Sequence, residues 1–118
     1  MTKATIYHNS QCSKSRATLQ ILKDHNIDVQ EIYYLKTPPT EKELNKIVTM
    51  LNIEPIHLIR TGENIFKELG LKNTDQKTKA EWLKIMTTNP ILIERPIVTI
   101  NGKAVIGRPP EKVLEIIT

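Results

Sequence analysis

Residues 4–16, ATIYHNSQCSKSR, contain the point around which we expect the whole fold to be organised. The residues before His8 predict a short β-strand, and apolar residues at helical spacing after Arg16 predict a helix. The chain's only cysteine, Cys12, therefore lies where a strand passes into a helix. The first N–H groups of a helix lack intrahelical partners and the helix dipole is positive there, so this position favours a thiolate.

The residues that follow Cys12 support this interpretation. Ser13 and Ser15 bring hydroxyl donors. Lys14 and Arg16 bring positive charge, and all of these groups favour a thiolate over a thiol. The same donors would also hold an oxyanion. The alternative is that Cys12 is a small buried hydrophobic residue, as free cysteines often are. We favour a reactive cysteine because its neighbours are polar or charged.

Length and composition restrict the class of protein. The 118 residues, 39% of them hydrophobic, predict a single domain over residues 1–118. No apolar run is long enough to span a membrane, and no signal peptide is evident. One cysteine cannot form an internal disulfide, so we expect a cytoplasmic protein. We also expect a monomer. The net charge of +4 comes from scattered lysines, and only 4% of the residues are aromatic, so we expect no nucleic-acid partner. A positive net charge suits a small anionic substrate.

Strand and helix patterns alternate along the chain. The expected strands are residues 4–7, 29–35, 97–100 and 103–106. The first two flank a helix, so they should be parallel with a right-handed crossover. Asn101-Gly102 between the last two predicts a hairpin, and Pro109-Pro110 opens a final helix. Because residues 40–88 carry helical patterns, we expect an α/β fold of the order βαβ, then a helical insertion at about residues 40–88, then ββα.

Two capping boxes predict where helices of the insertion begin. Thr40 precedes Glu43 by three residues, and Thr78 precedes Glu81 by the same spacing. In such a pair, each side chain accepts a hydrogen bond from the backbone N–H of the other residue.

Three arginines lie at the expected ends of elements: Arg60 after an apolar run, Arg95 before a strand and Arg108 after the hairpin. A guanidinium offers planar, two-point donors that suit tetrahedral oxyanions. Ordinary surface ion pairs would explain the same residues, and spacing along the chain cannot show that they converge.

Over essentially its whole length the sequence resembles the glutaredoxin-coupled arsenate reductase family, especially its short members. The segments that carry the resemblance are YHN at 7–9 with CSKSR at 12–16, YLKTPP at 34–39, PILIERPIV at 90–98 and IGRPPE at 106–111. Together they are highly specific, whereas any one of them alone would be weak.

The resemblance implies a thioredoxin-like fold with a helical insertion, which agrees with the expected order of elements. It implies that Cys12 is the nucleophile and that His8 and Ser15 adjust its ionisation. It further implies that three arginines bind the arsenate oxygens and that Pro96 follows a cis peptide bond. The three arginines are Arg60, Arg95 and Arg108.

The chemistry implied is reduction of arsenate, or a similar oxyanion, to arsenite for arsenic detoxification. Since the chain has no second cysteine, an outside thiol must resolve the adduct on Cys12. The resemblance implies glutathione as co-substrate, followed by glutaredoxin. We expect no tightly bound cofactor, and no metal site because no Cys/His cluster has ligand spacing.

Two other functions stay open at this point. Cys12-Ser13-Lys14-Ser15 is similar to the C-x-x-S site of monothiol glutaredoxins, which suggests a glutathione-dependent oxidoreductase. The second is a non-enzymatic regulator like the Spx proteins, which bind RNA polymerase. Redox-sensing members of that group carry C-x-x-C, and Ser15 argues against such a switch. Retention of all three arginines favours the reductase.

Overall fold

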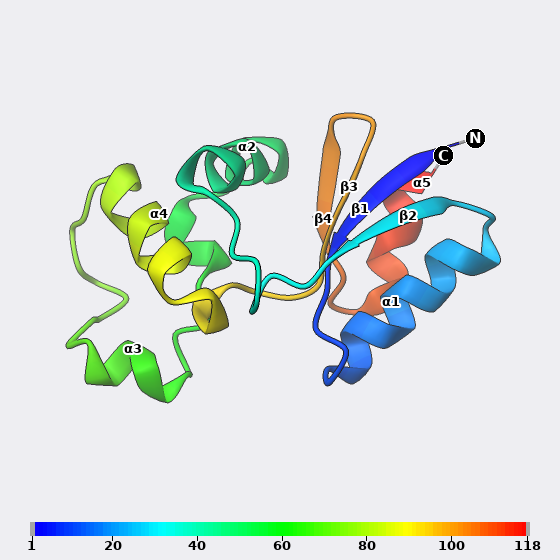
Figure 1. Cartoon of the computed structure of the whole chain (residues 1–118). Coiled ribbons are helices and arrows are strands. Elements are labelled where there is room, and N and C mark those ends of the chain that lie inside the picture. Colours follow the sequence, from blue (N-terminus) through cyan, green and yellow to red (C-terminus); the bar gives the residue numbers. More distant parts are fainter. Residues whose placement is uncertain (1, 118) are drawn as a thin grey trace. The chain divides into compact units, whose positions relative to one another are not determined.

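Four strands form one sheet in a unit built from the two ends of the chain, up to Thr37 and from Arg95 onward (Figure 1). The structure is a computed structural model and describes residues 2–117. A second unit, Pro38–Glu94, contains the helical insertion predicted at about residues 40–88. The expectation of a single domain over residues 1–118 stays a prediction.

The sheet has the strand order β2-β1-β3-β4. Its strands are β1 Lys3–Tyr7, β2 Asp28–Ile32, β3 Ile97–Ile100 and β4 Lys103–Ile106. β1 pairs with β2 in parallel, as predicted from the helix between them, and β3 is antiparallel to both β1 and β4. The predicted hairpin between β3 and β4 is confirmed: Asn101 and Gly102 have φ of 51° and 79°, the left-handed values that its two-residue turn requires.

Helix α1, Ser13–Asp24, and the C-terminal helices pack on this sheet (Figure 1). The final helix begins at Pro110 as a 3₁₀ segment, Pro110–Val113, and continues as α5, Leu114–Ile117. The core of the unit joins apolar residues of α1, the strands and the C-terminal segment: Ala4, Ile6, Leu22, Val98, Ile100, Val105, Val113 and Ile116. This packing holds α1 against the sheet through Leu22, in the second half of the helix.

The second strand is shorter than the sequence predicts. We expected it over residues 29–35, but β2 ends at Ile32. Within residues 2–117 its strand neighbour is β1, which ends at Tyr7, and the pairing is followed by a hydrogen bond from the His8 N–H to the Ile32 carbonyl (2.8 Å). Beyond this point no other strand of the described part of the chain continues the pairing. The Tyr33 carbonyl instead accepts hydrogen bonds from the N–H groups of Lys36 (3.0 Å) and Thr37 (2.9 Å), which makes residues 33–37 a turn.

The second unit is helical. Its elements are α2 Glu41–Leu51, the 3₁₀ segment Pro55–Leu58, α3 Asn64–Glu68, α4 Lys79–Thr88 and the 3₁₀ segment Pro90–Leu92. Both predicted capping boxes are confirmed, with Thr40 starting α2 and Thr78 starting α4. Across residues 2–117, no helix combines the length and the apolar character needed to cross a bilayer.

Candidate active site

One edge of the sheet brings together chain segments that lie far apart in the sequence. Tyr7, the last residue of β1, pairs with Ile32 at the end of β2 and with Ile97 at the start of β3. Ile97 also pairs with Ile106 at the end of β4. The loop after β1, the turn after β2, the segment before β3 and the segment after β4 therefore all leave the sheet at this edge.

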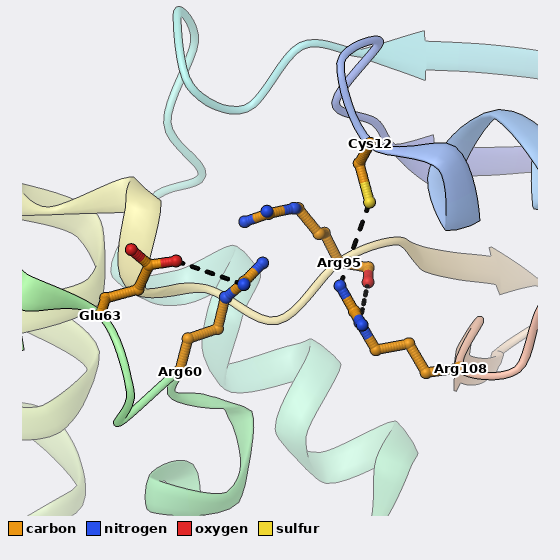
Figure 2. Close-up of polar contacts among 5 residues, drawn as sticks. All are labelled: Cys12, Arg60, Glu63, Arg95 and Arg108. Carbon is orange, nitrogen blue, oxygen red and sulfur yellow. Dashed lines mark hydrogen bonds and ion pairs between the residues drawn. The ribbon is translucent and has the colours of Figure 1, made fainter.

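Cys12 lies at this edge, directly before α1. It is the N-cap residue of the helix, and its N–H donates to the Asn9 carbonyl (3.0 Å), which closes a tight loop. The Arg108 guanidinium donates through Nη2 to the Cys12 sulfur (4.0 Å) and through Nε to the Arg95 carbonyl (2.8 Å), as Figure 2 shows. The sheet thus brings two of the three predicted arginines to the cysteine.

The surroundings of Cys12 favour its anionic form. Partial burial acts to raise the pKa of the thiol, but it is outweighed by groups that stabilise the thiolate. These are the backbone N–H groups of Ser15 and Lys14 and the Arg95 guanidinium, and together they lower the pKa of Cys12.

We expect a direct titration of the thiol to detect this shift. Because the folded pKa is lowered, the thiolate should form at a pH below the midpoint of an unperturbed cysteine, about 8.5. By linkage, the same shift should stabilise the fold as the pH rises through the interval between the folded and unfolded values. Thiolate absorbance against pH measures it without interference from another cysteine. A midpoint at or above about 8.5 would contradict the lowered pKa.

His8 and Ser15 form a buried pair beneath the loop. The His8 ring nitrogen Nδ1 and the Ser15 hydroxyl lie 2.6 Å apart, and the Asn9 N–H donates to the same hydroxyl (3.1 Å). Ser15 is fully buried and His8 is 4% exposed; burial is the largest cause that lowers the pKa of His8. The Ser15 hydroxyl therefore holds the loop together, and it is the backbone N–H of Ser15 that stabilises the thiolate. The assigned roles of both residues in catalysis stay predictions.

The structure adds a cation that the residues next to Cys12 did not indicate. Of the two neighbours expected to bring charge, Arg16 donates through Nη1 to the Ser10 carbonyl (2.7 Å), and Lys14 contributes its backbone N–H. Arg95, from the segment before β3, supplies the positive charge that lowers the pKa of Cys12.

Arg60 belongs to the second unit. It follows the 3₁₀ segment Pro55–Leu58, and its N–H donates to the Leu92 carbonyl (2.6 Å). Its side chain forms an ion pair with Glu63 (Nη2 to Oε1, 3.2 Å; Figure 2), and the buried Nη1 has no hydrogen-bond partner among the described residues. The approach of Arg60 to Cys12 stays a prediction.

Comparison with known proteins assigns the chain to a protein family. The model of the ArsC family matches residues 7–116. The chain belongs to the ArsC family. It is 44% identical to the uncharacterised protein YfgD of Escherichia coli, with 99% of both chains covered. It is 40% identical to an arsenate reductase of Neisseria meningitidis, covering 96% of this chain and 97% of that one.

Solved structures confirm the fold. The structure of an arsenate reductase from Vibrio cholerae superposes with a TM-score of 0.93 at 44% identity, covering 98% of each chain. The thioredoxin-like fold with a helical insertion, which the resemblance implied, is therefore present in this ArsC-family chain. The peptide bond before Pro96 is cis as expected; the bond before Pro109 is also cis, which the sequence did not indicate.

A glycine in this ArsC-family site allows the two arginine segments to pack closely. Gly107 lies between β4 and Arg108, and its N–H donates to the Pro96 carbonyl (2.9 Å). A Cβ at Gly107 would lie 2.5 Å from the Thr18 hydroxyl and 2.9 Å from Cγ of Pro96. Neither neighbour yields easily, because the Thr18 hydroxyl bonds to the Lys14 carbonyl (2.8 Å) and the proline ring is rigid.

Gly107→Ala should therefore destabilise the fold by about 1–3 kcal/mol, the usual cost of overpacking. Urea unfolding followed by circular dichroism measures the change. Gly62→Ala is the matched control, because a Cβ there meets nothing within 4 Å; it should be neutral or slightly stabilising. Equal stabilities for Gly107→Ala and the parent would contradict the close packing.

Within residues 2–117, no group of three or more His, Cys, Asp or Glu side chains is arranged to hold a metal ion.

Proposed function

We propose that this ArsC-family chain reduces arsenate to arsenite, with Cys12 as the nucleophile and with glutathione and glutaredoxin as reductants. The observation that carries the proposal is the Cys12 sulfur at the N-terminus of α1, in contact with Arg108 and with its pKa lowered by Arg95. A thiol with a lowered pKa beside fixed positive charge supports attack on an oxyanion. Arsenate reductases among the relatives of the chain support the choice of arsenate.

The bonding at each step follows from these groups. The Cys12 thiolate attacks As(V) and forms a sulfur–arsenic bond, and an arsenate oxygen leaves as water after protonation. Reduction of As(V) to As(III) takes two electrons, which two thiols supply when they are joined as a disulfide. Glutathione and glutaredoxin provide those thiols and end as a mixed disulfide. Water then breaks the sulfur–arsenic(III) bond, which releases arsenite and returns Cys12 to its thiolate.

Donors that lack partners in the protein support the binding step. The buried Nε of Arg95 and Nη1 of Arg60 have no hydrogen-bond partner among the described residues. Buried N–H donors are costly when unsatisfied, and arsenate oxygens would satisfy them. In this proposal Arg60 joins Arg95 and Arg108 in binding the oxyanion, and their charge balances the anionic transition state.

A coupled assay tests the function. Arsenate, glutathione, glutaredoxin, glutathione reductase and NADPH are mixed with the protein, and NADPH absorbance is followed. We expect oxidation of NADPH that depends on arsenate and on the protein. Reactions with phosphate in place of arsenate supply the control, because phosphate has the same shape but is not reduced. Reduction of a glutathione mixed disulfide without any response to arsenate would favour the monothiol oxidoreductase.

A further inference from the structure

We propose that Tyr34 is a positioning residue whose buried hydroxyl holds the Arg95 guanidinium beside the Cys12 sulfur. Tyr34 belongs to the YLKTPP segment, for which the proposed chemistry so far gives no role. It follows β2 in the turn that replaces the end of the predicted strand. The inference rests on the proposed function only where it concerns arsenate; the placement of Arg95 beside Cys12 is independent of the substrate.

The backbone fixes Tyr34 at the same edge of the sheet as Cys12. The His8 N–H is bonded to the Ile32 carbonyl (2.8 Å), so the cysteine loop and the turn at residues 33–37 start side by side. Two hydrogen bonds to the Tyr33 carbonyl then close the turn. Tyr34 is therefore held by the same pairing of β1 with β2 that positions the loop.

The two tyrosines of this turn have opposite environments. Tyr33 is 46% exposed, and its hydroxyl donates to Oε1 of Glu31 (2.7 Å). Tyr34 is fully buried together with its hydroxyl oxygen. A buried hydroxyl costs free energy unless it has polar contacts. The inward orientation of the Tyr34 side chain therefore requires a polar neighbour.

Arg95 is that neighbour. Its guanidinium interacts with both the Cys12 sulfur and the Tyr34 hydroxyl. Burial acts to lower the pKa of Arg95, but its interactions with the Cys12 sulfur and the Tyr34 hydroxyl raise the pKa above its ordinary value. A guanidinium has five N–H donors in a fixed plane, so an interaction with the tyrosine oxygen on one side restricts the direction of the remaining donors.

This arrangement limits the rotation of a long side chain. An arginine free to adopt several rotamers would spend part of its time away from the sulfur, at an entropic cost when it binds an anion. The Tyr34 oxygen reduces that freedom and leaves the buried Nε of Arg95 for an oxyanion. Tyr34 itself does not need to touch the substrate.

Tyr34→Phe tests the inference through the titration of Cys12. Loss of the hydroxyl should release Arg95 and raise the pKa of the Cys12 thiol by roughly half a unit to one unit. The KM for arsenate should rise about three- to tenfold, with a smaller change in kcat. Tyr33→Phe is the matched control: it removes the adjacent, exposed hydroxyl, keeps the ring, and should leave the Cys12 pKa unchanged.

Measuring Tyr34→Phe again in the Arg95→Ala variant separates the positioning of Arg95 from a general effect on the fold. With Arg95→Ala already present, Tyr34→Phe should cause no further change in the pKa of Cys12, because its effect passes through Arg95. An unchanged pKa in Tyr34→Phe alone, or an equal shift in both backgrounds, would overturn the inference. If thermal unfolding shows that Tyr34→Phe does not fold, Arg95→Ala alone must raise the pKa of Cys12, and an unchanged value would overturn the inference.

The thiol titration also separates this inference from the proposed function. A raised Cys12 pKa in Tyr34→Phe, in a protein without arsenate-dependent turnover, would support the role of Tyr34 and reject arsenate as substrate. Arsenate turnover with no effect of Tyr34→Phe on the Cys12 pKa would support the proposed function and overturn the role of Tyr34.

Discussion

Cys12→Ser should abolish arsenate reduction and leave arsenate binding largely intact. Serine is close in size to cysteine, and its oxygen can accept from the backbone N–H groups of Ser15 and Lys14 that stabilise the thiolate. Its hydroxyl stays protonated near neutral pH, however, whereas the pKa of Cys12 is lowered to favour the thiolate. Arg95 and Arg108 remain in place to bind the oxyanion. The coupled assay measures turnover, and isothermal titration with arsenate measures binding.

Alkylation provides an independent check on the same assignment. Because the chain has no other cysteine, iodoacetamide should add one group, detectable by mass spectrometry, and turnover should fall in proportion. Arsenate should slow the reaction by occupying the site. Retained arsenate reduction in Cys12→Ser, or in the fully alkylated protein, would show that the nucleophile is another group.

The local features of this fold could be predicted because neighbouring residues determine them. A capping box requires two residues three positions apart, and Thr40 with Glu43 forms the predicted pair. Asn101-Gly102 likewise forms its turn through its own backbone preferences. The junction of strand and helix at Cys12 depends on the patterns on either side of it, and the structure has it there.

The features that the sequence did not predict depend on tertiary pairing. The second strand was expected to reach Leu35, but it stops where β1 ends, at Tyr7. The residues next to Cys12 did not indicate the charge of Arg95, because spacing along the chain contains no information about sheet order. The pairing of β1 with β3 brings Arg95 to this edge.

The resemblance to a family supplied what periodicity could not. Spacing alone left Arg95 and Arg108 open as surface residues, and the motifs indicated that both belong to one site. The structure has them in contact, Arg108 Nε donating to the Arg95 carbonyl. The pairing of β3 with β4 explains this contact, because the segment before β3 and the segment after β4 meet at the same edge of the sheet.

Arg95→Lys should lower kcat/KM for arsenate by about ten- to a hundredfold. The positive charge remains, but lysine has no planar two-point donor set and no Nε, the buried donor of Arg95 that lacks a protein partner. Loss of one charge-assisted hydrogen bond is typically worth roughly 1.5–3 kcal/mol, which corresponds to this range. Both arsenate affinity and turnover should decline, since the arginine serves the ground state and the transition state.

Arg16→Lys is the matched control for this substitution. Arg16 also lies near the loop, but its guanidinium bonds to the Ser10 carbonyl, and lysine can still donate there. It should stay close to the parent in both arsenate affinity and turnover. The two variants therefore separate a requirement for guanidinium geometry at one position from a general requirement for charge. If Arg95→Lys matched the parent while Cys12 remained essential for glutathione exchange, the oxyanion role would fail, and the monothiol oxidoreductase would explain the site better.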